Sequence, residues 1–409
     1  MWRVDSPQVG CSFESRMTQM SSSTPSHHRT FAEIDTTALR SNLRLLQKTV
    51  GPGRALILVV KSDAYGHGAG TVAAIAAEEG ITHFAVASVD EGIQLRRADV
   101  TGEIILLHPP SQYDFPAVTE LKLTPSISSE ESAVLYSRLA DSHTLTAHVE
   151  INTGLSRLGL DWRTAADSVA RIAALPKLKI TGIYTHYRAH YSPVGDAIQE
   201  QSDRFKSVLD GLQRLGINPG LRHAASSYPA AYHHRTTLFD GIRVGIIAYG
   251  ALEPLPQPVS GILPVMSVRS CVMLIRQVSA GEWVHYGDGF QAPRDMTIAV
   301  IPIGYGMGYT RHLSNCGEML IHGRSCPIVG VVGMDMTMID VSAIPGLKVG
   351  DPVTVMGRDG EGEITALNIA RKTGTIAYEI ICRLGNGLPR YVVKSEGVPN
   401  PTAQVSTPH

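Results

Sequence analysis

A lysine at the end of a buried strand is the residue of this chain that most clearly implies chemistry. Residues 55–60 (ALILVV) predict the strand, because the run is short, apolar and rich in β-branched side chains. Lys61 follows it directly, and Gly66 and Gly68 mark the turn that comes next. A lysine in a dry site loses its proton more easily, so Lys61 could form an imine with a carbonyl compound. The alternative is a structural lysine whose stem covers apolar surface while its amine reaches water.

Repeated strand-like runs indicate the scaffold that holds this lysine. Eight such runs start near Ala55, Thr82, Glu103, Leu123, Leu145, Leu178, Leu221 and Asp240. Helical patterns separate most of them, at residues 70–80, 90–98, 129–141, 162–175 and 196–215. Eight strands alternating with helices favour an α/β fold with a closed parallel (β/α)8 barrel. An open doubly wound sheet is the alternative, but no Gly-x-Gly-x-x-Gly motif follows the first strand.

The barrel prediction places the other polar candidates beside Lys61. Active sites of such barrels lie at the C-terminal ends of the strands. Arg157 follows the fifth run and His186 ends the sixth. Ser226 and Ser227 follow the seventh run, and Arg243 to Ile246 end the eighth. Barrels commonly bind phosphate with these two loops, and Ser226, Ser227, Gly245 and Ile246 are placed for that, the last two through their backbone N–H groups. All of these residues are therefore expected at one rim.

The pattern changes near Pro264, where a second domain is expected to begin. Long β-rich runs (residues 265–278, 296–303, 319–341 and 352–356) alternate with glycine turns and lack helical crossovers. We therefore expect the barrel over residues 30–263 and a separate all-β domain over residues 264–395. Residues 1–29 and 396–409 are polar and are predicted to be disordered extensions.

Composition narrows the function classes. With 409 residues the chain can bury a large enzyme core, and its net charge of −1 gives no electrostatic reason to expect nucleic acid or an anionic membrane as partner. No apolar stretch approaches the ~20 residues that a membrane helix needs. The five cysteines and the histidines lack metal-ligand spacing, which is typical of a reduced, cytoplasmic protein.

The segment around Lys61 resembles the cofactor-lysine motif of the alanine racemase family. Further motifs that resemble this family follow in the family's order over residues 31 to about 393. They are residues 152–159 (NTGLSRLG), 239–245 (FDGIRVG), 249–250, 286–287, 304–306, 333–335 and 377–380. The first strand, residues 30–34, is expected by this resemblance to join the β domain, with a helix at residues 37–48 leading into the barrel.

The resemblance implies an isomerase that uses pyridoxal 5'-phosphate. Lys61 would carry the cofactor and act as one base, while Tyr286 of the other subunit of a homodimer would act as the second base. Arg243 would face the pyridine nitrogen, where a permanently charged arginine donates a hydrogen bond without protonating the ring. His186 would lie beside Arg243. In isolation, Tyr286 could equally be a turn residue.

The remaining roles concern the phosphate of the cofactor and the carboxylate of the substrate. Tyr65 and Tyr378 resemble phosphate-binding tyrosines of the family. Arg157 would contact both the cofactor and, with Met334 of the partner subunit, the carboxylate of the alanine substrate, since a guanidinium binds a carboxylate bidentately.

Several positions depart from the family pattern. Glu150 stands where many relatives have a carbamylated lysine, and it is expected to orient Arg157 directly. Ser226 replaces an asparagine and Gly333 a cysteine, Met307 lies where an acidic residue is usual, and residues 385–387 (GNG) replace an arginine-bearing stretch. These changes concern the entrance of the site more than its chemistry.

The sequence therefore predicts an alanine racemase that supplies D-alanine for peptidoglycan, with Tyr378 keeping the pocket narrow. A broad-specificity or serine racemase of the same fold is the nearest alternative. A barrel-type decarboxylase would need a glycine-rich phosphate loop and a cysteine-bearing acidic motif, which we do not find. A non-catalytic carrier of the cofactor would resemble the barrel alone.

Overall fold

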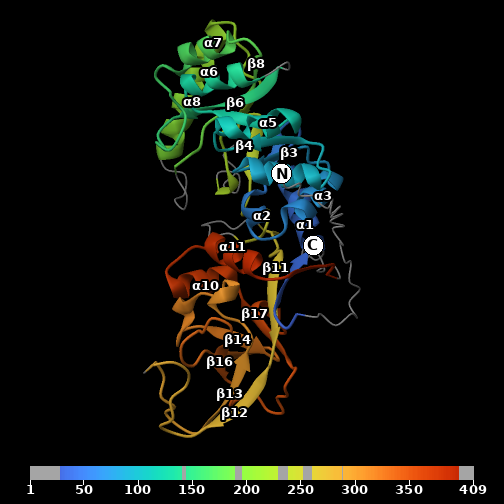
Figure 1. Cartoon of the computed structure of the whole chain (residues 1–409), viewed down its shortest axis with the longest axis vertical. Helices are drawn as coiled ribbons and strands as arrows, with labels where there is room; N and C mark the ends of the chain where they lie inside the picture. Colours follow the sequence, from blue (N-terminus) through green and yellow to red (C-terminus); the bar gives the residue numbers. More distant parts are fainter. Residues whose placement is uncertain are drawn as a thin grey trace, which may run out of the picture.

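The computed structural model describes residues 28–140, 144–188, 196–228, 238–251, 260–287 and 289–395. The molecule is elongated, with a barrel and its helices at one end and a mostly β part at the other (Figure 1). This is the predicted fold class, a parallel barrel followed by a separate β-rich domain. The disorder expected for the two termini falls almost entirely outside the described residues.

Eight parallel strands form the barrel. The sheet runs in the order β5-β4-β3-β2-β10-β9-β8-β6, and β5 also pairs with β6, which closes the ring and excludes the open sheet. Each strand begins within one residue of its predicted start. The strands are β2 (Ala55–Val59), β3 (His83–Val86), β4 (Glu103–Leu106), β5 (Thr124–Ile127), β6 (Leu145–Asn152), β8 (Leu178–Tyr184), β9 (Leu221–His223) and β10 (Gly241–Val244).

Helices cover the outside of the ring. Side chains cap two of them in the way the sequence indicates, because Ser88 and Ser129 each accept a hydrogen bond from the first turn. One short helix, α5, was not predicted, since six residues that include a proline show too little periodicity. The helices are α3 (Ala69–Glu78), α4 (Val89–Arg97), α5 (Phe115–Glu120), α6 (Glu130–Leu139), α7 (Ala165–Ala173) and α8 (Asp196–Arg214).

The barrel interior is unusually polar for a packed core. His148, Glu150, His223 and Arg243 are all buried on its strands. Gly182 makes room for one of them, because a Cβ there would lie 2.5 Å from the His148 ring. Buried polar groups persist only when they are paired, so these side chains should form a connected network.

The C-terminal part contains two sheets. One has the order β15-β14-β17-β11-β1-β19 and the other the order β12-β13-β16. The first strand of the chain, β1 (Phe31–Asp35), pairs with β11 and β19, and helix α1 (Thr36–Val50) then leads into the barrel. The remaining strands are β11 (Met266–Cys271), β12 (Leu274–Val278), β13 (Met296–Ile301), β14 (Glu318–Ile321), β15 (Arg324–Pro327), β16 (Thr337–Asp340), β17 (Pro352–Asp359) and β19 (Arg390–Val393).

The prediction of an all-β domain was wrong in one respect. Helices α10 (Ala366–Thr373) and α11 (Ala377–Gly387) follow the sheets and lie next to the barrel (Figure 1). A cap at Thr365 begins the first of them, and both bury one apolar face. Their short amphipathic patterns were overlooked beside the longer β-rich runs.

Two further findings concern the whole chain. Within the described ranges, every helix is too short or too polar to cross a bilayer. Four cysteines are free thiols, namely Cys271, Cys316, Cys326 and Cys382, and Cys11 lies outside the described residues.

Candidate functional site

Lys61 lies at the C-terminal rim of the barrel, two residues beyond Val59, which is the last residue of β2. The residues that follow it, Ser62 to Tyr65, form a left-handed turn (the segment labelled α2, Lys61–Tyr65) with φ between 52° and 54°. Burial lowers the pKa of Lys61, and repulsion by Arg157 lowers it further. The amine is therefore more easily deprotonated than an exposed lysine, as the predicted nucleophile requires.

The left-handed turn is held from outside. Left-handed geometry costs roughly 1–2 kcal/mol for each residue that is not glycine, so other contacts must offset it. Asp63 accepts a hydrogen bond from the Ala69 N–H at 2.6 Å and forms an ion pair with Arg390 at 2.6 Å. The Ser62 N–H donates to Glu91 at 2.6 Å. Arg390 belongs to β19, so the C-terminal part of the chain fixes the geometry of the lysine segment.

Glycines bring helix α11 against the same turn. A Cβ on Gly385 would lie 2.2 Å from the carbonyl oxygen of Gly66, and a Cβ on Gly66 would lie 2.7 Å from the carbonyl oxygen of Ile381. Only glycine permits this approach of two backbones. The departure from the family pattern at residues 385–387 therefore has a structural reason here, which is close packing against the lysine segment.

Arg243 is almost fully buried on β10. Its Nη1 donates to Nδ1 of His223 at 2.5 Å, and its Nη2 donates to the carbonyl oxygens of Thr185 and Ala224 at 2.7 and 2.9 Å. Nη2 also lies 3.2 Å from Nδ1 of His186, as the predicted pairing of these residues requires. Burial lowers the pKa of Arg243 to about 10, so the guanidinium is still charged at neutral pH.

The candidate phosphate residues converge beside Tyr65. Ser227 accepts a hydrogen bond from the Gly245 N–H at 3.0 Å, and a Cβ on Gly245 would lie 2.6 Å from the Tyr65 hydroxyl oxygen. Among the described residues, the Ile246 N–H has no acceptor. The Tyr378 ring lies 6.0 Å from the Tyr65 ring. Tyr65, Ile246 and Ser227 thus surround a small cradle whose free backbone donor suits an anion.

One expected role within this cradle changes. The Gly245 N–H is bonded to Ser227, so it is less available to an anion than the Ile246 N–H. Ser226 is half-buried and has no hydrogen bond to another described side chain or backbone group. It remains a candidate contact beside Ser227.

Arg157 lies on the loop after β6 and is exposed. Among the described residues it forms no hydrogen bond or ion pair. Among the described residues, no hydrogen bond or ion pair joins Glu150 to it, and the Glu150 carboxylate accepts a hydrogen bond from Tyr184 at 3.2 Å. Burial raises the pKa of Glu150, and attraction to Arg157 opposes that rise. The two residues therefore interact through space, which makes an orienting role for Glu150 weaker than expected.

Tyr286 and Met334 are separate from this rim. They are 73% and 55% exposed, and no contact among the described residues joins them to Lys61, Arg243 or Arg157. Tyr286 lies between β12 and β13, whose strands occupy the end of the molecule away from the barrel (Figure 1). A single chain therefore brings together every predicted site residue except these two.

Sequence reasoning missed three residues near the site. His223 ends β9, so the same barrel rule that selected His186 could have found it. Asp63 and Arg390 carry no sequence signal, because their pairing depends on how the two parts of the chain pack.

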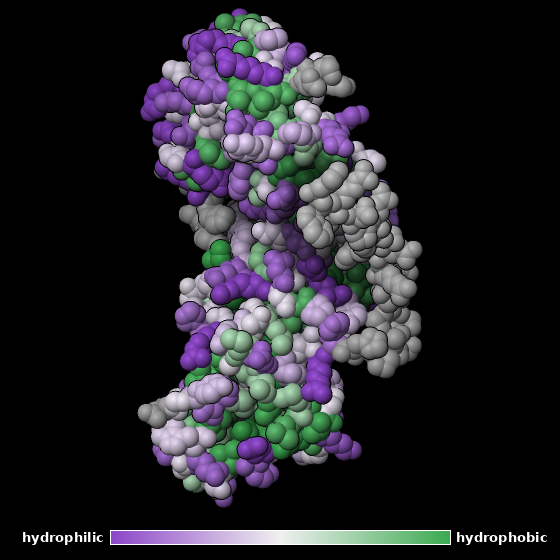
Figure 2. Space-filling view, in the orientation of Figure 1, coloured by the Kyte–Doolittle hydropathy of each residue, from purple (hydrophilic) through white to green (hydrophobic). Residues whose placement is uncertain are grey.

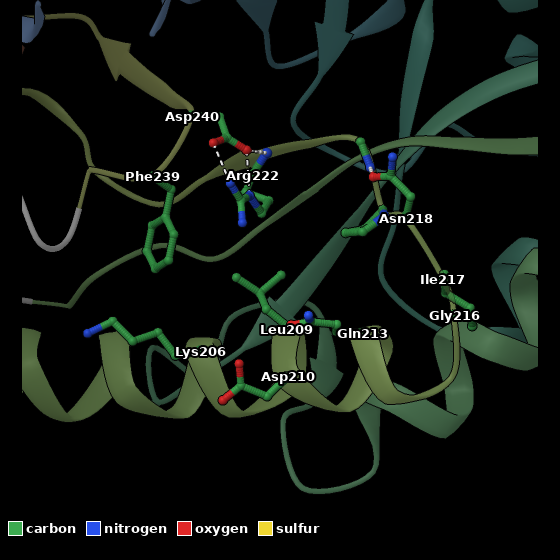
Figure 3. Close-up of a pocket in the computed structure, with 12 residues that line it drawn as sticks. Lys206, Leu209, Asp210, Gln213, Gly216, Ile217, Asn218, Arg222, Phe239 and Asp240 are labelled. Carbon is green, nitrogen blue, oxygen red and sulfur yellow. Dashed lines mark hydrogen bonds and ion pairs between the residues drawn. The ribbon is translucent and has the colours of Figure 1, made fainter. Parts of the chain in front are cut away.

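A surface cavity of about 810 Å³ lies elsewhere. It lies at the starts of β9 and β10, on the opposite face of the barrel, and helix α8 forms one of its sides (Figure 3). Arg222 and Asp240 line it and pair with each other at 2.5 Å. This cavity has no convergent reactive group comparable to Lys61.

Comparisons with known proteins identify relatives over nearly the whole chain. Two family models match, described as the alanine racemase N-terminal domain at residues 34–253 and the alanine racemase C-terminal domain at residues 265–392. A curated alanine racemase of Nostoc sp. is 37% identical over 371 residues, which cover 88% of this chain and 95% of the relative. One of Halothermothrix orenii is 36% identical, with 88% and 96% covered.

Solved structures show the same similarity. An alanine racemase of Clostridium difficile 630 has a TM-score of 0.84 and 30% identity, covering 90% of this chain and 97% of that one. The alanine racemase of Bacillus anthracis with bound L-Ala-P has a TM-score of 0.83 and 30% identity, covering 92% and 98%. The likeness therefore extends over both parts of the chain.

Proposed function

This chain belongs to the alanine racemase family, and we propose that it interconverts L- and D-alanine with pyridoxal 5'-phosphate as its cofactor. The observation that carries the proposal is the half-buried Lys61, whose pKa is lowered at the rim where the anion cradle and Arg243 also lie. When bound, the cofactor supplies an electron sink that makes the α-proton of an amino acid removable.

The residues present fit pyridoxal phosphate both at its phosphate and at its ring nitrogen. The cradle of Tyr65, Ser227 and Ile246 offers two hydroxyl groups and a free backbone N–H to a phosphate. Arg243 offers a charged donor to a ring nitrogen. Since its pKa of about 10 is still well above neutral, Arg243 donates a hydrogen bond and keeps its proton. The ring nitrogen would then stay unprotonated, so the cofactor would withdraw electrons less strongly and side reactions such as transamination would be disfavoured.

A racemase needs a proton acceptor on each face of the substrate. Lys61 is one, and we propose Tyr286 of the partner subunit as the other, with Met334 of the partner subunit closing the carboxylate site around Arg157. This proposal is supported by the exposure of Tyr286 and Met334 and of apolar side chains near them. Hydrophobic residues gather on the visible face of the C-terminal part, whereas the barrel face is largely hydrophilic (Figure 2). Exposed apolar side chains on loops of the C-terminal part include Trp283, Tyr305 and Met336.

We propose alanine as the principal substrate. The absence of a side chain at Gly333 does not enlarge the surrounding space, because a Cβ there would lie 2.9 Å from the Met336 carbonyl oxygen and 3.0 Å from the His285 ring. His285 fills the room that the glycine leaves. Tyr378 beside Tyr65 would narrow the pocket on the barrel side.

Circular dichroism tests the activity directly. The purified protein, supplied with pyridoxal phosphate, is incubated separately with L-alanine, D-alanine, L-serine, L-lysine and L-arginine. We expect both alanine signals to decay to zero and the others to decay at least tenfold more slowly. Comparable decay of serine or the basic amino acids would instead support a broad-specificity racemase, and no decay of alanine would refute the proposal.

The biological role is a further proposal. D-Alanine made in the cytoplasm would supply peptidoglycan. Deletion of the gene should then make growth depend on added D-alanine, and growth without it would show another source or another role.

A further inference from the structure

Arg243 is connected to the opposite end of the barrel through two buried histidines. Its Nη1 donates to Nδ1 of His223, and Nε2 of His223 lies 3.0 Å from Nδ1 of His148. On the far side, Nε2 of His148 lies 3.5 Å from Oε1 of Glu103, and among the described residues it has no hydrogen-bond partner. Glu103 is the first residue of β4, so this row of four side chains runs from the candidate site to the N-terminal face of the barrel.

The partners fix where each ring proton lies. Arginine has donors and no acceptor, so Nδ1 of His223 must accept and its single proton must be on Nε2. That proton is donated to Nδ1 of His148, which must therefore also accept. The proton of His148 is then on Nε2, where it points toward Glu103. Both rings are neutral, and the Nε2–H of His148 faces the Glu103 carboxylate across 3.5 Å.

The fold makes room for this row of side chains, which runs from Arg243 through His223 and His148 to Glu103. Gly182 leaves the space that the His148 ring occupies, and the pairing of β6 with β8 shifts register between Ala147 and His148. The His223 ring stacks on Tyr184 with centroids 4.9 Å apart and planes 11° apart. Burial, together with the charge of Arg243, lowers the pKa of His223 well below its usual value, which agrees with a neutral ring.

At the far end, Glu103 has partners other than His148. Thr124 donates to its Oε1 at 3.0 Å, and Nε2 of His83 lies 3.5 Å from its Oε2 near the surface. Burial raises the pKa of Glu103, but the contacts with His148, Thr124 and His83 outweigh this and lower it overall. The carboxylate is thus ionised at neutral pH and available as an acceptor.

We propose that Glu103 is a positioning residue for Arg243, acting through His148 and His223 by attracting the Nε2 proton at the far end of a row whose two ring protons are both on Nε2. The row holds the guanidinium in place against the ring nitrogen of the cofactor. The effect on catalysis rests on the proposed function, whereas the proton positions do not.

The proton positions can be seen by neutron diffraction from crystals of the cofactor-loaded protein. We expect deuterium on Nε2 and not on Nδ1 of both His148 and His223. Deuterium on Nδ1 of His148, or on both nitrogens of either ring, would overturn the proposal. This result does not depend on what reaction the protein catalyses.

Kinetics test the positioning role. Glu103→Ala leaves the His148 Nε2–H without an acceptor, and we expect kcat to fall about tenfold while KM for alanine changes less than about twofold. The split follows because Arg243 faces the cofactor and not the substrate carboxylate. Glu103→Gln offers an amide oxygen to the same N–H and should restore kcat to within about threefold of wild type.

His83→Ala is the matched control. It removes the other histidine beside Glu103 and leaves the row intact, so kcat should stay within about twofold. An unchanged kcat in Glu103→Ala, an equal loss in His83→Ala, or no rescue by Glu103→Gln would each overturn the proposal. A wild-type protein that does not racemise alanine but shows the expected ring protons would refute the function and leave the row established.

Discussion

At the barrel rim Arg243 is 3% exposed and bonds to four groups of its own chain, whereas Tyr286 on the C-terminal part is 73% exposed and its ring contacts the neighbouring His285. Both are candidate functional residues. The rim is pre-organised by the fold of one chain, and the C-terminal loop presents its tyrosine outward. The difference supports our proposal that one chain builds half of a site and that a second copy supplies the other half.

The rim itself also depends on the C-terminal part. Arg390 and helix α11 hold the turn after Lys61. The two parts are thus joined in two ways, within one chain through packing and, as we propose, between chains through Tyr286.

Removal of the Lys61 amine should have the largest effect. Lys61→Ala should lower the racemisation rate about a thousandfold or more, since it removes both the cofactor attachment and one base. In the wild-type protein, borohydride should fix the cofactor on the peptide that contains Lys61, as mass spectrometry can show. Lys48→Ala, an exposed lysine on α1, is the control. Attachment at another lysine would contradict the assignment.

Mixed dimers test the comparison most directly. Lys61→Ala and Tyr286→Phe homodimers should each be nearly inactive, with the second losing about 10²–10⁴-fold. In a mixed dimer one shared site collects both defects and the other collects none. Random pairing makes about half of the dimers mixed, so about a quarter of wild-type activity should return.

The mixed dimers must be shown to be present, by pull-down with a different tag on each variant. If they form and no activity returns, Lys61 and Tyr286 belong to the same subunit or Tyr286 is not the second base. The rim would then be complete without a partner.

Gly385→Ala tests the packing between the two parts. The added Cβ would meet the Gly66 carbonyl oxygen at 2.2 Å, so the free energy of unfolding should fall by about 1–3 kcal/mol and activity should fall with it as the lysine turn shifts. Thermal unfolding and racemisation measure the two effects. Asn386→Ala, the exposed next residue of the same helix, should leave both nearly unchanged. Equal behaviour of the two variants would show that the contact does not constrain the turn.

The smallest effect is expected at Glu150. Its carboxylate accepts a hydrogen bond from Tyr184, and it attracts Arg157 only through space. Glu150→Gln should raise KM for alanine about threefold, with kcat little changed. Exposed Glu120→Gln controls for the loss of one negative charge. A rise of a hundredfold would mean that the two residues are in direct contact when substrate is bound.

The barrel and its rim were accessible from the sequence because they depend on local patterns. Strand periodicity placed each strand start within one residue, and the rule that sites lie at the C-terminal ends of barrel strands brought Lys61, His186 and Arg243 together. These inferences need only the order of apolar and polar residues along the chain.

Other features depend on closure of the fold and were not predictable in this way. Ser62, Asp63 and Ala64 adopt left-handed geometry that their residue types do not favour, and tertiary contacts impose it. His148 in the middle of a strand looks like any buried histidine until Gly182 of the neighbouring strand leaves room for it. The indirect link between Glu150 and Arg157 likewise depends on which groups surround the carboxylate.

The tie between Lys61 and Arg390 also has a consequence for synthesis. Barrel residues leave the ribosome first, but the lysine turn is not held until β19, near the end of the chain, has emerged and paired with β1. A nascent barrel would therefore carry its reactive amine on an unconstrained segment. The lysine turn is therefore expected to reach its final geometry only after β19 has been made, and a chain that ends before β19 is not expected to capture the cofactor in a productive geometry.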